Sequence, residues 1–174
     1  MKRTREMLVA GGIVMACIAL LLGPQISHGQ RKAAATEQTY HSLSANQAAT
    51  ILTDMGVAHV QDVDSMGDPM FVLTLGDDKA LLLFYKSGTD EADPYTSIQL
   101  HTGWKTDGKD LSRGVNTWNR KKRFTRAWYD DERDLHLEAD LDLAGGVTRQ
   151  GIETFISRYT KDVGVFPVFV LVGN

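Results

Sequence analysis

His101 and His136 are the residues of this sequence best suited to acid–base or metal chemistry. Each lies in a run of alternating polar and apolar residues that is typical of a β-strand, so the two rings could become neighbours across a sheet. Because imidazole titrates near neutral pH and binds zinc, this pair and nearby acids could serve a small metal-dependent or hydrolytic enzyme. Neither histidine belongs to a metal-binding motif, however. We therefore prefer the simpler interpretation of half-buried positions on strands.

One acidic loop invites a calcium-binding interpretation, because Asp62, Asp64 and Asp68 supply carboxylate oxygens at close intervals. The comparison with an EF-hand loop fails at two positions. Met66 stands where a third ligand belongs, and Leu73 occupies the position of the bidentate acid. We therefore predict an ordinary solvated turn and no metal site.

The motifs of the common enzyme classes are missing from the sequence. It contains no Gly-x-Ser-x-Gly elbow and no glycine-rich phosphate loop. Glu138 and Asp140 share one face of a predicted strand, as a pair of glycosidase acids would, but the same spacing marks an ordinary solvent-exposed face. The sequence therefore predicts a protein without catalytic residues and without a cofactor.

A basic and aromatic segment in the second half of the chain offers the best candidates for contact with a partner. Its basic residues are Arg120, Lys121, Lys122, Arg123 and Arg126, and its aromatic residues are Trp118, Phe124 and Trp128. Basic side chains at the end of a helix interact favourably with the helix dipole. We therefore interpret the cluster as a helix end, and we expect no nucleic-acid partner.

Asn119 ends the helix predicted in this segment. Its amide could bond backbone groups as a structural cap, which is the interpretation we favour, or line a groove that receives a peptide backbone beside Trp118 and Arg123. We take Trp118, Asn119, Arg123 and Trp128 as the candidate partner-binding residues. The expected partner is a protein or a peptide.

The first residues have the pattern of an export signal. Three basic residues precede an apolar run from Met7 to Leu22. This run reaches only about 25 Å as a helix, less than the ~30 Å core of a bilayer, which favours cleavage over retention as an anchor. Residues 1–29 are therefore a predicted signal peptide, and we expect the mature domain in the periplasm or outside the cell. The alternative is an inner-membrane anchor with the domain facing the periplasm.

Cys17 is the only cysteine and lies inside this signal. The residues before it loosely resemble a lipobox, but strongly apolar residues follow it, which makes lipidation the less favoured alternative. Cleavage would leave no thiol for a disulfide or for catalysis. The cleaved chain would keep 16 basic and 21 acidic residues, a net charge of 16 − 21 = −5, and we expect membrane contact only through an uncleaved N-terminal segment.

Hydrophobic periodicity predicts the order of elements after a linker at residues 30–41. A capping box at Ser44 and Gln47 opens a helix that Gly56 ends. Strands are predicted at 57–63, 70–75, 79–86 and 95–102, a helix at 110–122, a hairpin of 124–129 with 135–143, and a third helix from Thr148 to about 163. In the second strand of the hairpin, His136, Glu138, Asp140 and Asp142 are expected to face solvent. This order indicates an α+β domain with an antiparallel sheet.

The most apolar stretch of the mature chain comes at its end, in residues 167–174 and just before them. Pro167 cannot donate a backbone hydrogen bond, so we predict an extended segment or a short strand after the third helix. Such a segment must be covered in water. The cover we prefer is the core or sheet edge of the domain itself; a second copy of the chain in a homodimer, or the membrane surface, is the alternative.

Several short stretches together resemble the bacterial YbjN family over residues 42–166. They are Val115-Asn116-Thr117-Trp118-Asn119-Arg120, Arg123-Phe124, Ala127-Trp128-Tyr129, Leu137 to Leu143 and Gly145-Gly146-Val147-Thr148. The resemblance implies an α+β domain like that of type III secretion chaperones, which bind extended polypeptide segments, and members are labelled sensory transduction regulators. We therefore predict an exported, non-catalytic binding or regulatory module.

Overall fold

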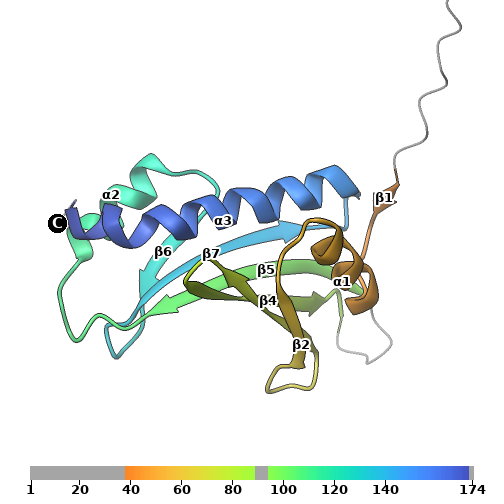
Figure 1. The fold of residues 1–174 in the computed structure, drawn as a ribbon, viewed down its shortest axis with the longest axis horizontal. Helices are drawn as coiled ribbons and strands as arrows, with labels where there is room; N and C mark the ends of the chain where they lie inside the picture. The colour runs from red at the N-terminus through yellow and green to blue at the C-terminus, as the bar shows by residue number, and fades with distance from the viewer. Residues whose placement is uncertain (1–37, 89–93, 173–174) are drawn as a thin grey trace, which may run out of the picture. The chain divides into compact units, whose positions relative to one another are not determined.

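The computed structural model describes residues 38–88 and 94–172 (Figure 1). The helices are α1 (Ala45–Asp54), α2 (Ser112–Lys121) and α3 (Arg149–Val172). The longer strands are β2 (His59–Val63), β3 (Pro69–Leu75), β4 (Asp78–Lys86), β5 (Tyr95–Trp104), β6 (Arg126–Tyr129) and β7 (Leu135–Asp142). Two short strands, β1 (Thr39–Tyr40) and β8 (Val147–Thr148), pair with each other.

Six strands form one antiparallel sheet in the order β2-β3-β4-β5-β7-β6. The chain leaves this sheet after β5 to form α2 and then returns as the hairpin of β6 and β7, which adds β7 beside β5. Helix α3 then runs back along one side of the sheet (Figure 1). This arrangement confirms the predicted α+β class. The type III secretion chaperone-like arrangement within that class stays a prediction.

The side of the sheet that faces α3 holds the hydrophobic core, because alternate strand residues point to it. Fully buried members from the strands are Phe71, Leu73, Leu82, Ile98, Leu100 and Leu137, and those from α3 are Ile152, Ile156, Tyr159, Val163, Phe166 and Val170. Tyr159 fixes α3 to the sheet, since its hydroxyl donates to the Leu137 carbonyl oxygen at 2.7 Å and shares a hydrogen bond with the Thr102 hydroxyl at 3.0 Å. Burial raises the pKa of this tyrosine.

Most of the predicted elements are confirmed. The Ser44–Gln47 capping box is present at the start of α1, and the Thr148 hydroxyl accepts a hydrogen bond from the Gly151 N–H near the start of α3. Strand β4, which corresponds to the strand predicted at 79–86, lies between β3 and β5. The fold begins earlier than residue 42, however, because Thr39 and Tyr40 of the predicted linker pair with β8.

The prediction of an extended segment after Pro167 is wrong, because α3 continues through the proline to Val172. An interior proline removes one helical hydrogen bond and costs about 3 kcal/mol. Phe166 and Val170 are fully buried on either side of it, and burying such side chains contributes roughly 1.5 to 3 kcal/mol each. Tertiary packing therefore outweighs the local cost of Pro167.

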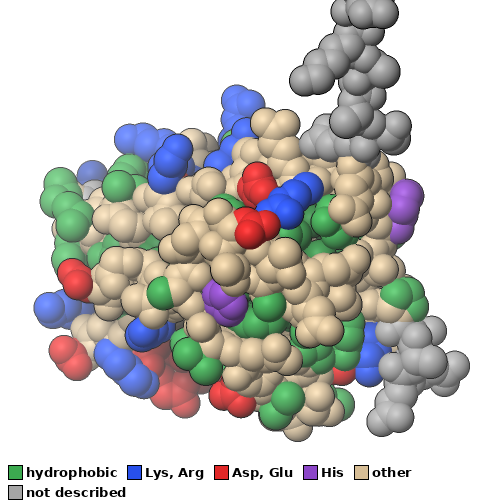
Figure 2. Space-filling model, turned by 45° about the vertical axis from the view of Figure 1, so that its right-hand side comes forward, with side chains coloured by type: hydrophobic (Ala, Val, Ile, Leu, Met, Phe, Trp, Pro, Cys, Tyr) green, Lys and Arg blue, Asp and Glu red, His purple; other side chains and the backbone are tan. Residues whose placement is uncertain are grey.

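The expectation that the apolar end is covered by the domain itself holds for one face of the helix only. Phe166 packs on Trp118, with ring centroids 4.8 Å apart, and on Trp104 at 5.3 Å. The opposite face is exposed, at Val165, Val168, Leu171 and Val172. Figure 2 shows hydrophobic side chains gathered at the end of the domain where α3 finishes.

The predicted signal peptide, its cleavage site and Cys17 lie outside the described residues. In the part of the chain that the structure does describe, no helix has both the length and the apolar character that a membrane crossing requires.

Candidate functional site

The four candidate partner-binding residues do not form one surface. Trp118 is fully buried between α2 and α3, and its indole N–H donates to the Thr125 hydroxyl at 3.1 Å. The expectation that Trp118 lines a groove is therefore wrong. A tryptophan on the apolar stripe of a helix gains most by burying its large ring, and here Phe166 and Phe169 both contact it edge to face.

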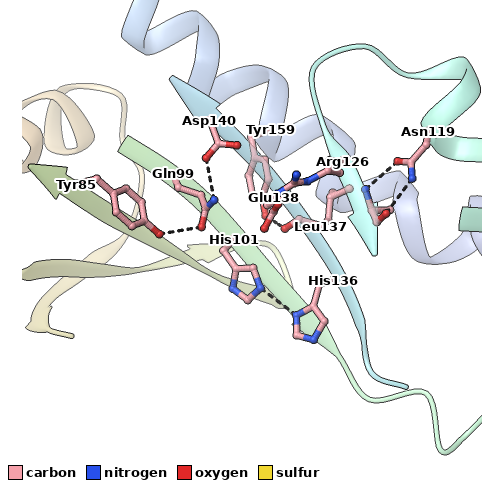
Figure 3. A network of polar contacts seen from close by, with 11 residues as sticks. Tyr85, Gln99, His101, Asn119, Arg126, His136, Leu137, Glu138, Asp140 and Tyr159 are labelled. Atoms are coloured by element: carbon pink, nitrogen blue, oxygen red, sulfur yellow. Dashed lines mark hydrogen bonds and ion pairs between the residues drawn. The ribbon is translucent and has the colours of Figure 1, made fainter. Parts of the chain in front are cut away.

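Asn119 closes the outer edge of the sheet. Its amide group donates to the Ala127 carbonyl oxygen and accepts from the Ala127 N–H, both at 2.9 Å (Figure 3). These are the two bonds that a neighbouring strand would make to β6, so the side chain covers an edge that could otherwise pair with another chain. Both the nitrogen and the oxygen of the amide bond within the domain, which fits the structural role that we favoured for Asn119.

Replacing Asn119 by alanine is expected to lower the free energy of unfolding by about 2 kcal/mol. The change removes two hydrogen bonds and leaves the buried main-chain groups of Ala127 without partners. Urea denaturation of the variant measures the effect. Asn116→Ala, at an exposed position of the same helix, is the matched control and should change stability by less than about 0.5 kcal/mol. Equal stability of the two variants would show that the amide does not hold β6.

The other two candidates lie apart from each other. Arg123 is exposed in the segment between α2 and β6. Trp128 lies on the side of the sheet opposite α3, where its ring stacks on His136 with centroids 4.3 Å apart. Its indole N–H is buried and has no hydrogen-bond partner among the described residues. Of the predicted set, only Arg123 and part of Trp128 remain available to a partner.

The structure instead reveals an open strand edge on β7. Strand β6 pairs with β7 only as far as Arg126 opposite Glu138, and no described strand continues this pairing along residues 139–142. The Leu143 N–H donates to the Thr96 carbonyl at 2.7 Å, so the odd-numbered residues of this strand bond to β5. Because antiparallel pairing alternates, the main-chain groups of Asp140 and Asp142 point to the open side.

A groove of about 500 Å³ lies directly against this edge. Its walls come from β7, from the first half of α3 and from the residues before β6; among them are Ala139, Leu141, Thr154, Phe155, Arg158 and Phe124. Phe124 is 61% exposed at the mouth, with the Arg158 guanidinium 4.5 Å from its ring centre. The groove therefore combines an apolar wall, a cation and free main-chain groups.

His101 and His136 come together on the opposite side of the sheet (Figure 3). His101 Nε2 lies 2.9 Å from His136 Nδ1, and His136 Nε2 lies 3.0 Å from an Asp130 carboxylate oxygen. A Cβ on Gly103 would lie 3.2 Å from two atoms of the His136 ring, so glycine leaves the space that this ring needs. The idea that strand pairing brings the two histidines together is confirmed.

The geometry of the pair is that of a hydrogen bond. An ion held at zinc distances by both nitrogens in a tetrahedral arrangement would separate them by about 3.3 Å, which is more than the separation here. Within the described residues, no group of three or more potential ligands converges on a metal position. Burial, and next the His136 ring, lower the pKa of His101; the hydrogen bond from His136, as the main cause, lowers the pKa of Asp130.

Glu138 departs from the prediction of a solvent-facing position, because it is only 5% exposed. It lies opposite His101 on β5 and opposite Arg126 on β6, and the Arg126 guanidinium pairs with its carboxylate. The arginine side chain covers the acid, which is why alternation alone misjudged it. Its neighbour Asp140 does face solvent and accepts a hydrogen bond from the Gln99 amide at 2.8 Å.

We did not predict the β7 groove from the sequence, because it depends on the difference in length between β6 and β7 as much as on residue type. A comparison of the two predicted hairpin strands, 124–129 and 135–143, already shows that the first is shorter than the second. That difference was the available signal for an unpaired edge.

One family model matches the chain. The YbjN model, described as putative bacterial sensory transduction regulator, matches residues 44–163, which is more than half of the chain. A search of curated proteins gives no match.

Proposed function

Because the chain belongs to the YbjN family, we propose that this regulatory module is exported, is not catalytic, and binds an extended segment of a partner protein along the open edge of β7. The single observation that carries the proposal is that the main-chain groups of Asp140 and Asp142, beside the groove, pair with no strand among the described residues. Export rests on the signal pattern of residues 1–29.

Strand addition explains why the edge and the groove lie together. A segment that pairs with residues 139–142 of β7 would occupy the position that β6 would fill if it began before Arg126. Its alternate side chains would then enter the groove and contact Ala139, Leu141 and Phe155. The other edge of this hairpin, at Ala127, is already occupied by Asn119. The domain therefore offers β7, and not β6, for pairing.

The charges around the edge indicate the chemistry of the partner. Asp140 and Asp142 project to the solvent side of β7 and are both exposed. Opposite charges directly across a pair of strands contribute roughly 0.2 to 1 kcal/mol. The bound segment should therefore alternate apolar residues, which face the groove, with at least one lysine or arginine opposite these aspartates.

A proline substitution tests the proposal without breaking the sheet. Asp140→Pro removes the N–H that points to the open edge but none of the bonds between β7 and β5, so we expect it to weaken binding about tenfold or more. The matched control is Gln61→Pro on β2, whose N–H also points to a free edge, because the Thr74 N–H donates to Ala58 and pairing alternates from there.

The probe is a phage-displayed library of random linear peptides, selected on the purified domain. We expect selected peptides to carry the alternating pattern and to lose affinity for Asp140→Pro and for the groove-filling variant Thr154→Trp, while Gln61→Pro binds normally. Circular dichroism of each variant checks that the fold is kept. Selected peptides that bind all the variants equally would contradict the proposed site.

A second candidate function is a small metal-dependent or hydrolytic enzyme built on His101, His136 and Asp130. Its support is the chain of contacts from Asp130 through His136 to His101. Metal analysis of the purified protein, with hydrolysis of generic ester substrates, tests it. A metal-free protein whose His101→Ala and His136→Ala variants match the wild type in these assays would eliminate this candidate.

A further inference from the structure

The row of side chains His101, Glu138 and Arg126 crosses three adjacent strands on the side of the sheet opposite α3. His101 and Glu138 each have two neighbours in this row or beside it that can bond to them. His101 bonds to His136 along the sheet, and Glu138, which lies directly opposite His101, is paired with Arg126. Cβ atoms of residues directly opposite each other lie about 5 Å apart, so a charged His101 could reach Glu138 by a change of rotamer.

The hydrogen bond between the two histidines requires that one of the facing nitrogens lack a proton. His101 Nε2 and His136 Nδ1 lie 2.9 Å apart, so one must donate and the other accept. A pair with one positive charge can keep this bond, because the neutral ring still offers an acceptor nitrogen, while Asp130 and the stacked Trp128 ring hold His136 from its other side. A second proton makes both facing nitrogens donors, and the bond cannot persist.

We propose that His101, His136 and Glu138 form a proton-operated switch, in which acid moves His101 from His136 to Glu138 and releases Arg126. The released arginine begins β6, immediately after Phe124 and Thr125 of the groove wall. The switch therefore acts at the end of the groove, and it is independent of whether a peptide binds there. A domain exposed to the periplasm or to the medium would experience external acid directly.

The charged groups around His101 and His136 determine which acid a charged His101 can reach. Those on the same side of the sheet or in the adjoining turn include Asp130, Asp134, Asp140, Asp142, Lys105, Lys79, Arg126 and Glu138. Lys105 is paired with Asp134, and the Lys79 ammonium bonds to the Thr74 hydroxyl at 2.6 Å. Asp130 is engaged with His136, which leaves Glu138 as the acid directly across from His101.

Stability should follow pH with a defined sign. The pKa of His101 is lowered in the folded protein, so the unfolded chain takes up its proton first as pH falls. The stability that this group contributes is complete above about pH 6.5 and is lost as pH decreases from there through the folded pKa. The lowered pKa of Asp130 changes stability only below about pH 4, so the pH ranges in which His101 and Asp130 affect stability are separate.

Nuclear magnetic resonance of the full chain labelled with ¹⁵N tests the switch, with ring-nitrogen and guanidinium signals followed from pH 8 to pH 4. We expect the His101 and His136 ring nitrogens to lose their mutual hydrogen bond in one acid transition, with the Arg126 guanidinium signals changing at the same midpoint. Glu138→Gln should move the His101 midpoint down by about half a pH unit and abolish the coupled arginine change.

His59 provides the matched control, because it is also half-buried and its Nδ1 bonds to the Val57 carbonyl at 2.9 Å. His59→Gln should leave the transition unchanged, whereas His101→Asn should remove it together with the loss of stability below pH 6.5. If Glu138→Gln fails to fold, Arg126→Lys offers a second test, since a weaker competitor for Glu138 should raise the midpoint. Arg126 signals that stay constant while His101 titrates would overturn the proposal.

Discussion

Replacing Trp118 by alanine is expected to lower the free energy of unfolding by about 3 to 5 kcal/mol. The ring is fully buried, contacts Phe166 and Phe169 edge to face, and lies beneath the Lys122 ammonium at 4.6 Å. A change of this size is a large share of the ~5 to 15 kcal/mol that usually stabilises a domain. Urea denaturation of the variant, monitored by circular dichroism, measures it.

Phe124→Ala is the matched control for this prediction. Phe124 is an aromatic residue of the same segment but is 61% exposed, and its main contact is the Arg158 guanidinium. It should lose no more than about 1 kcal/mol. If Trp118→Ala were as stable as Phe124→Ala, then Trp118 would not be a core residue. The result would instead favour the partner-binding role that the sequence suggested for it.

Deleting residues 168–174 is expected to lower the melting temperature by about 6 to 12 °C. The deletion removes the fully buried Val170 and the half-buried Phe169 and shortens α3, a loss of roughly 3 kcal/mol at about 2 to 4 °C per kcal/mol. Glycine at position 114 lets α2 approach this part of α3 so closely that a Cβ there would overlap the Val170 backbone. Differential scanning calorimetry measures the shift.

A double variant separates the covered face of α3 from the exposed one. Val168→Ser with Leu171→Ser changes only exposed positions, so the melting temperature should shift by no more than about 2 °C. If the wild-type chain self-associates, this variant should reduce the association in analytical ultracentrifugation. A truncated chain that melts at the wild-type temperature would contradict the packing of the α3 end described above.

The sequence predicted the fold well where periodicity and caps agree. The alternation of β7, the apolar stripe of α2 and the capping box of α1 each depend on neighbouring residues alone, so the sequence contains them in full. The end of α3 could not be predicted in this way. The cost of Pro167 is local, but the gain that offsets it comes from Trp104 and Trp118, which are distant in sequence.

The candidate site was harder to predict than the fold. The contact between His101 and His136 follows from strand register, which the sequence suggests. The space that Gly103 leaves for the His136 ring could not be predicted from the sequence. Glu138 looked solvent-exposed because the covering Arg126 belongs to another strand. The β7 groove depends on where β6 begins, at Arg126, after the chain has come from α2.

Amide hydrogen exchange at the open edge of β7 and at the outer edge of β2, as the described residues form them, tests the central claim most directly. The measurement compares the domain alone with the domain bound to a peptide selected from the random library. Our account predicts that the Asp140 and Asp142 amides exchange at least about tenfold more slowly in the complex, while the Gln61 amide on the β2 edge exchanges at its original rate. Slower exchange at Gln61, with Asp140 and Asp142 unchanged, would contradict it, because the partner would then bind somewhere other than the open edge of β7.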